Sequence, residues 1–261
     1  MTLERRAVFL DEMGIGPLWQ RRDMPVATET PAALEPMPAV ALAEERTVAE
    51  QASVIAAVPR APEAPPSSAV AGMNWMQLKE SVAGCVKCGL CNGRTKTVFG
   101  VGDEKAKWLF IGEGPGRNED QTGEPFVGPA GKLLDNMLRA IGVKRGENAY
   151  IANIVKCRPT DGNGRDRPPT QEETAACMPY LERQIALIQP TVLVALGKTA
   201  ALSLLGLDPE TPVSKLRGTV HRYAGLPLVV TYHPAYLLRS LPEKRKAWTD
   251  LCLAMTTYAN A

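Results

Sequence analysis

Four cysteines are spaced as ligands of a metal centre. Cys85 and Cys88 form a CxxC pair, and Cys157 and Cys177 lie far along the chain, each next to a segment with a helical pattern. Four thiolates can hold either a structural zinc ion or a 4Fe-4S cluster. The spacing alone leaves both open, and buried free cysteines are the third interpretation.

The other two cysteines do not belong to that set. A ferredoxin-type run would need a cysteine at position 95, where Thr95 stands, so Cys91 is interpreted as a bystander or a substitute ligand. Cys252 lies in the last helical segment and is most simply a small core residue. Six cysteines are too few for a disulfide scaffold in a chain of 261 residues. Clustered cysteines such as those near residue 88 are typical of metal sites in reducing compartments.

A glycine-rich run, Gly112-Glu113-Gly114-Pro115-Gly116, could be mistaken for a nucleotide-binding loop. Its spacing differs from GxGxxG, and Pro115 removes an amide that a phosphate would bind. A second phosphate-loop candidate, at residues 197–199, lacks the first required glycine because Val192 occupies that place. The run is better interpreted as a tight turn whose backbone closely approaches a small planar ligand.

His233 is one of two histidines, and it ends an apolar run. A lone histidine is more often structural, and we interpret His221 in that way. His233, however, is followed by a proline and then by Tyr236, Leu237, Leu238 and Arg239. Apolar side chains beside a cation suit insertion into a duplex stack with a phosphate contact.

The elements that must position these residues alternate along the chain. Runs without polar alternation are typical of strands buried on both faces, and four occur, at 108–111, 150–155, 191–196 and 228–232. Helical patterns cover 74–83, 130–141, 171–188, 198–205 and 243–258, the third opening on Thr170 as a candidate N-cap. We therefore expect a parallel sheet flanked by helices.

Ligands of open parallel sheets bind outside the carboxyl ends of the strands. The glycine-rich run, the segment from Asn153 through Lys156 and Arg158, and the segment that begins at His233 follow three of the predicted strands. We expect these three loops to converge on one crevice.

The chain ahead of these elements has a different composition. Residues 25–70 hold eight prolines and thirteen alanines but no glycine or aromatic residue, so they cannot supply a packed core. We predict a short docking peptide at 1–24, a disordered linker at 25–72 and a folded domain at 73–261. The domain holds 24 basic and 18 acidic residues, a formal charge of +6 that the acidic linker reduces to +2 for the whole chain.

Composition also excludes several classes of protein. No apolar run approaches the 18 residues that a membrane span requires, and Arg5 and Arg6 interrupt the place of a signal peptide. We expect a cytoplasmic, nucleoid-associated protein that binds no membrane.

Several of these motifs occur together, in order, over residues 75–257. Cys85-x-x-Cys88, VFGVGD (98–103), GEGPGRNEDQTGEPFVGPAGKLLD (112–135), NIVKCRP (153–159), Cys177 and TYHPAYLLR (231–239) resemble a family-four uracil-DNA glycosylase, the iron-sulfur type. The resemblance implies a three-layer α/β/α sandwich with a central four-stranded parallel sheet. It also implies a 4Fe-4S cluster held by Cys85, Cys88, Cys157 and Cys177.

The resemblance gives the site residues roles in excising uracil from single- or double-stranded DNA. Phe126 would stack on the flipped base, and the Asn153 amide would accept from uracil N3–H and donate to O4, a pattern that cytosine reverses. His233, with backbone amides of the turn from Glu113 to Gly116, would stabilise the charge that builds on uracil O2. That turn contains Gly114, Pro115 and Gly116.

The residue that orients the attacking water is an open choice. Related families place Asp or Asn just after the first strand, where this chain has Gly114. Our hypothesis is that Glu113 positions the water and that Glu119 shapes the uracil pocket. On the DNA side, Leu237 or Leu238 would fill the vacated stack, Arg239 would hold a phosphate, and Lys156 and Arg158 would lie along the DNA path.

The first residues carry a separate resemblance. RRAVFLDEMGIGPLWQRR (5–22) is similar to the peptide of the clamp-loader psi subunit that docks on the chi subunit. It implies that Met13, Ile15, Leu18 and Trp19 bind a chi-like partner and through it single-stranded-DNA-binding protein. The alternative is an extension without a partner.

Two other functions compete with excision. A covalent uracil-DNA-trapping variant of the same superfamily needs an inserted basic loop, but this chain runs directly from its glycine-rich segment into a helical pattern at Leu133. A non-catalytic iron-sulfur adaptor would not need Asn153, Phe126 and His233.

Overall fold

The computed structural model describes residues 68–261. The predicted docking residues Met13, Ile15, Leu18 and Trp19, and the predicted linker up to residue 67, lie outside the described residues. Helix α2 (Ser68–Ala71) falls inside the range predicted as linker, and its Val70 is buried in the core. Residues 68–71 therefore pack with the folded domain, upstream of the predicted boundary at residue 73.

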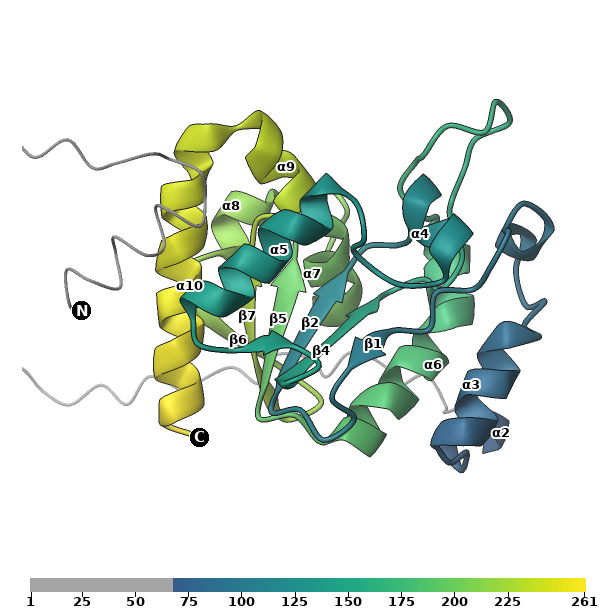
Figure 1. The fold of residues 1–261 in the computed structure, drawn as a ribbon, viewed down its shortest axis with the longest axis horizontal. Helices are drawn as coiled ribbons and strands as arrows, with labels where there is room; N and C mark the ends of the chain where they lie inside the picture. Colours follow the sequence, from purple (N-terminus) through teal and green to yellow (C-terminus); the bar gives the residue numbers. More distant parts are fainter. Residues whose placement is uncertain (1–67) are drawn as a thin grey trace, which may run out of the picture. The chain divides into compact units, whose positions relative to one another are not determined.

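A seven-stranded sheet forms the centre of the domain, in the order β1-β4-β2-β5-β7-β6 with β3 beside β4. Its four inner strands are parallel and lie side by side in Figure 1. They are β4 (Asn148–Asn153), β2 (Trp108–Gly112), β5 (Val192–Leu196) and β7 (Leu226–Thr231). These are the four predicted apolar runs, and the central four-stranded parallel sheet is confirmed.

Three short strands were not predicted. β1 (Val101–Gly102) and β6 (Val220–Tyr223) pair antiparallel at the two edges, and β3 (Lys144–Arg145) pairs parallel with β4. β1 and β3 have only two residues each, too few to show an alternation of apolar and polar residues, and β6 is only half-buried. None of these three strands therefore has the continuous apolar run that marks the inner strands.

Helices cover both faces of the sheet, which gives the three layers that were predicted (Figure 1). One face packs against α3 (Trp75–Ala83), α6 (Gln171–Ile188) and α7 (Lys198–Leu205). The other packs against α5 (Pro129–Ala140), α9 (Pro234–Arg239) and α10 (Lys244–Ala259). Thr170 caps α6 in a capping box with Glu173, as expected.

The remaining elements are short helices in the connections: η1 (Gly89–Asn92), α4 (Arg117–Thr122), α8 (Val213–Leu216) and η2 (Leu241–Glu243). Within residues 68–261, no helix is both long and apolar enough to cross a membrane.

Candidate active site

A cleft opens where β2 and β4 end and β7 passes into α9. Its volume is about 1210 Å³, including the mouth that is open to solvent. The three loops expected to converge do line it, together with the segment after α4 and the loop before α6. The lining includes Glu113, Gly114, Pro115, Gly116, Glu119, Phe126, Asn153, Asp166, Arg167, His233, Tyr236 and Arg239.

Asn153 supplies a buried acceptor at the base of this cleft. It is the last residue of β4 and only 2% exposed, and its side-chain Oδ1 has no hydrogen-bond partner. Gly112, which pairs with Asn153 across the strands, leaves room for the amide. A Cβ on Gly112 would lie 2.5 Å from Asn153 Oδ1 and 2.7 Å from Phe126 Cζ. A buried amide oxygen without a protein partner is free to accept a hydrogen bond from a ligand in the cleft.

Phe126 places an aromatic face in the same cleft. Its backbone is left-handed, with a φ of 55°, an unusual conformation for a bulky residue. Its ring lies 5.5 Å from the His233 ring, centroid to centroid, at an interplanar angle of 30°. Glu119 braces the segment that follows, because its Oε1 accepts from the amides of Val127 (3.0 Å) and Gly128 (3.3 Å).

His233 is held as a neutral donor. It is the N-cap of α9, and its Nδ1 accepts from the amide of Ala235 at 3.2 Å, so the proton of the neutral ring is on Nε2. Burial, reinforced by the Arg239 cation and opposed by the Glu119 carboxylate, lowers the pKa of His233 to about 4. The imidazole is therefore uncharged at neutral pH and presents an N–H to the cleft.

Glu113 is fixed just beyond β2. Its Oε2 accepts from the Thr199 hydroxyl in the first turn of α7. Burial raises the pKa of Glu113, and the Thr199 hydrogen bond opposes that shift. Backbone pairing continues past the strand ends, since the amides of Ile154 and Val155 donate to the carbonyls of Gly112 (2.9 Å) and Glu113 (3.2 Å). The contact between Thr199 and Glu113 joins residues 86 positions apart, so the sequence motif at residues 197–199 could not reveal it.

Burial excludes Lys156 as a DNA contact, and of the two leucine alternatives it leaves only Leu238. Leu237 is completely buried between α5 and the sheet, whereas Leu238 is 42% exposed, because neighbouring residues of a helix point in directions about 100° apart. Lys156 is also buried, and its Nζ donates to the carbonyl of Asn153 (2.8 Å) and to Gln184 Oε1 (2.7 Å). Its ammonium therefore stabilises residues behind the cleft and is too deeply buried to contact a DNA phosphate.

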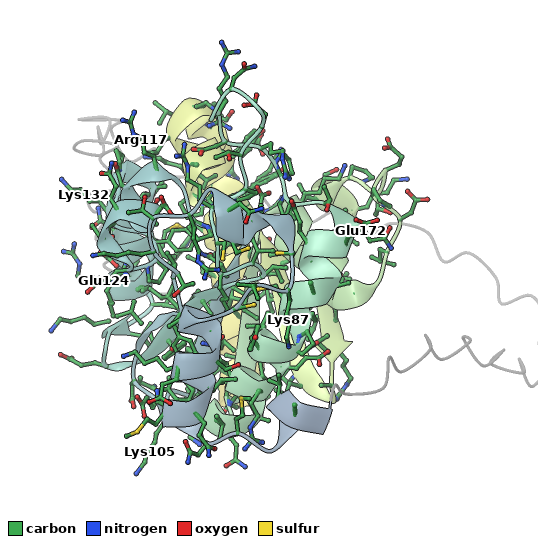
Figure 2. All side chains as sticks on the ribbon, turned by 90° about the vertical axis from the view of Figure 1, so that its right-hand side faces the viewer. Lys87, Lys105, Arg117, Glu124, Lys132 and Glu172 are labelled. Atoms are coloured by element: carbon green, nitrogen blue, oxygen red, sulfur yellow. The ribbon has the colours of Figure 1, made fainter. Side chains whose placement is uncertain are left out.

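Arg239 and Arg158, the two predicted DNA-contacting arginines, differ in their surroundings. Arg239 is exposed and lines the cleft. Arg158 donates to Asp166 Oδ1 at 2.6 Å, which fixes the loop ahead of α6. Arg117 of α4 and Lys132 of α5, which were not predicted, project on one side of the molecule in Figure 2.

The cysteines line a second, smaller cavity of about 350 Å³. Cys85, Cys88, Cys157 and Cys177 all face it, and so does Cys91. Its charged lining residues are all cationic: Lys87, which is labelled in Figure 2, Arg94 and Lys156. Cys252 is on α10, away from this lining.

Two of the sulfur atoms that line this cavity accept hydrogen bonds. Arg94 Nη1 donates to Cys157 Sγ at 3.4 Å, and the Lys156 amide donates to Cys177 Sγ at 3.3 Å. Burial raises the pKa of the Cys177 thiol to about 11, and the Lys156 cation opposes that shift. In the described part of the chain, no three His, Cys, Asp or Glu side chains lie close enough to share one metal ion. Thiols surrounded by cations and amide donors suit an anionic centre that is held through sulfur.

Comparison with known proteins agrees with this geometry. The family model of the uracil DNA glycosylase superfamily matches residues 99–253, more than half of the chain. The chain belongs to the uracil DNA glycosylase superfamily. The match spans every cleft residue described above, together with Cys157 and Cys177.

The relatives of this glycosylase include type-4 enzymes. The chain is 45% identical over 164 residues to the type-4 uracil-DNA glycosylase of Thermotoga maritima, covering 62% of this chain and 82% of the relative. It is 47% identical over 163 residues to that of Archaeoglobus fulgidus, covering 60% and 79%. A type-5 uracil-DNA glycosylase of Pyrobaculum aerophilum is 28% identical over 152 residues, covering 52% and 64%. The resemblance to family four is confirmed.

Proposed function

We propose that this chain excises uracil from DNA in base excision repair and leaves an abasic site. Family membership and the type-4 relatives give the reaction class. The observation that carries the substrate assignment is the unpaired Oδ1 of Asn153, which lies buried at the base of an open cleft.

Asn153 selects uracil by its hydrogen-bond pattern. Its unpaired oxygen accepts from uracil N3–H, and its amide nitrogen donates to O4. Cytosine has an unprotonated N3 and a 4-amino group. The Asn153 oxygen would therefore face another acceptor at N3, and its amide nitrogen would face another donor at the 4-amino group. A buried polar group left mispaired costs about 1–3 kcal/mol, which favours uracil strongly.

Phe126 and the DNA surface bring the base into place. The base leaves the duplex at a cost of a few kcal/mol, and stacking on an aromatic ring returns about 1–3 kcal/mol. Leu238, together with the exposed Tyr236, offers apolar surface to the vacated stack, and Arg239 is placed to hold a flanking phosphate.

His233 stabilises the leaving group. The bond between uracil N1 and sugar C1′ breaks with its electron pair on uracil, and negative charge develops on O2. The Nε2–H of the neutral ring donates to that oxygen, assisted by the backbone amides near Gly114 and Gly116. An uncharged donor that is already fixed by the Ala235 amide needs no reorganisation at this step.

Glu113 positions the water, and Thr199 holds the carboxylate in place. The water oxygen bonds to C1′ as the C1′–N1 bond breaks, and one water proton passes to the Glu113 carboxylate. Solvent takes that proton from the carboxylate and supplies one to the departed uracil anion. Because an amide cannot take the water proton, we expect Glu113→Gln to slow single-turnover excision while uracil-DNA binding persists. Full excision by that variant would refute this role.

The reaction assignment has a direct test. Purified protein should release free uracil from single-stranded and U:G duplex oligonucleotides, measured by chromatography of the base. His233→Ala, in which leaving-group stabilisation is lost, should bind the same DNA and release uracil slowly. Folded protein that releases no uracil would refute the assignment and favour the adaptor function.

We also propose that Cys85, Cys88, Cys157 and Cys177 hold a 4Fe-4S cluster. Four thiolates can hold a zinc ion as well as a cluster, and the resemblance to family four favours the cluster. A cubane binds one thiolate at each iron and suits sulfurs spread around a cavity. When bound, the cluster would link the segment before η1 to the loop after β4 and stabilise the fold.

Metal analysis separates the two metals. Wild-type protein should be brown, with a broad absorbance shoulder and about four irons per chain, the composition of the cluster. Cys157→Ser should lose iron, whereas Cys252→Ser should retain it. One zinc and no iron in protein purified without oxygen would overturn the cluster assignment.

The docking peptide remains a further proposal. Residues 1–24 with Met13, Ile15, Leu18 and Trp19 would bind a chi-like subunit and bring the enzyme to single-stranded-DNA-binding protein on replicating DNA. Full-length protein should capture purified chi, and Trp19→Ala should not. Equal capture by both proteins would refute it.

A further inference from the structure

Phe126 needs a restraint that its own sequence does not supply. Its φ of 55° puts a bulky residue in the left-handed region, a strained conformation that persists only where the surroundings hold it. A relaxed backbone would turn the ring away from the cleft. The contacts that hold this peptide therefore decide whether the stacking face is present before the base arrives.

Arg145 of β3 makes those contacts. Its Nη1 donates to the carbonyl of Pro125 at 2.8 Å, and its Nη2 donates to the carbonyl of Phe126 at 2.9 Å. Its Nε donates to Asp135 Oδ1 of α5 at 2.9 Å, which orients the guanidinium plane. One planar side chain thus binds two successive carbonyls, a geometry that a lysine ammonium cannot reproduce.

The same carbonyl is enclosed from the other side. A Cβ on Gly131, in the first turn of α5, would lie 1.7 Å from the Phe126 oxygen, so the helix backbone approaches it more closely than any side chain would allow. Arg145 is anchored in turn, since β3 pairs with β4, the strand that ends at Asn153. The clamp connects the stacking ring to the strand that carries the uracil-reading amide.

We propose that Arg145, oriented by Asp135, is a positioning residue for uracil: it holds the Phe126 peptide so that the ring lies preformed as the stacking face of the cleft. The inference deepens the proposed function and rests on it. Arg145 touches no substrate atom and acts only through Phe126.

A double-mutant cycle tests this dependence. Single-turnover excision from a uracil-containing single strand gives a maximal rate and a half-saturating enzyme concentration for Phe126→Ala, Arg145→Ala and the double variant. Each single variant should lose roughly 5- to 150-fold in the ratio of these constants, the kinetic equivalent of one stacking contact. In the Phe126→Ala background, the added Arg145→Ala change should lower the ratio of these constants by less than a further twofold, since the ring that Arg145 positions is absent.

Companion variants separate positioning from simple loss of fold. Lys144→Ala, which removes an exposed ion pair with Glu147 from the neighbouring residue of β3, is the matched control and should excise normally. Added guanidinium ion at millimolar concentration should partly restore Arg145→Ala, and Arg145→Lys should stay impaired. Asp135→Asn should show a smaller loss in the same direction.

The outcomes distinguish the inference from the function beneath it. Normal excision by Phe126→Ala would refute the stacking role, and the inference with it. Impaired Phe126→Ala beside normal Arg145→Ala would overturn the inference alone. Additive losses in the double variant, or a melting temperature of Arg145→Ala that falls without a change in either kinetic constant, would show that Arg145 serves the fold only.

Discussion

Replacing Gly112 with alanine adds one methyl group between two side chains of the uracil cleft. Gly112 is the last residue of β2 and lies in ordinary strand conformation, so its backbone accepts alanine. The new Cβ would lie 2.5 Å from Asn153 Oδ1 and 2.7 Å from Phe126 Cζ. Real Cβ atoms essentially never approach other atoms within 3.0 Å, so both side chains must move.

The size of the effect follows from these distances. Restoring ordinary contact requires shifts of about 1 Å, and a misplacement of that size at a reacting centre costs up to about 100-fold in rate. Overpacking costs about 1–3 kcal/mol, which corresponds to roughly 5- to 150-fold in the ratio of maximal rate to half-saturating concentration. Because the displaced groups are the amide and the ring of the cleft, that cost should fall on uracil excision.

Single-turnover excision from a uracil-containing single strand measures this loss. Gly72→Ala is the matched control, because nothing lies within 4 Å of the Cβ it would add. Its kinetic constants should equal those of the wild type. If Gly112→Ala excised uracil within twofold of the wild-type ratio, the assigned positions of Asn153 and Phe126 at the base would be wrong.

Three other predictions follow from burial. Burial lowers the pKa of His233 from 6.5 to about 4 in the folded protein, so the unfolded chain binds a proton on this residue more readily. The contribution of His233 to stability is therefore complete above pH 6.5. It is lost as the pH falls toward 4, by about 3 kcal/mol at most. Urea unfolding of wild type and His233→Gln should therefore differ in pH slope between pH 4.5 and 6.5, and equal slopes would count against a neutral ring. Leu238→Ala should slow excision from U:G duplex more than from single strands, without a change in the melting temperature of the protein. Leu237→Ala should instead lower the free energy of unfolding by about 2–5 kcal/mol, because its side chain is buried. The reverse pattern would contradict the orientation of α9. Lys156→Met leaves the Asn153 carbonyl and Gln184 Oε1 unpaired, at about 1–3 kcal/mol each, so its denaturation midpoint should fall, and an unchanged midpoint would argue against these bonds.

The inner sheet and the long helices could be predicted because their signals are local. Continuous apolar runs marked the four parallel strands, and the rule that ligands gather at strand ends placed Asn153 and His233 in one cleft. Leu237 and Leu238 could not be separated in the same way. The helix of six residues that contains them gives no period long enough to show which side chain faces the core.

Other features depend on contacts between distant residues. Lys156 resembles a surface cation in sequence, and only packing shows that its ammonium ends on Gln184, 28 residues away. The left-handed backbone of Phe126 and the guanidinium that fixes it come from segments 19 residues apart. No local pattern marks either one, because neither is a property of local conformation.

The backbone ladder between β2 and β4 extends beyond the two strands, through the bonds from Ile154 and Val155 to Gly112 and Glu113. The floor of the uracil cleft is therefore part of the sheet, and its amides should exchange with solvent as slowly as those of the inner strands. A floor of that rigidity cannot open to admit a base. The distortion that brings uracil into the cleft must be borne by the nucleic acid, so the enzyme should work fastest where the DNA is easiest to deform.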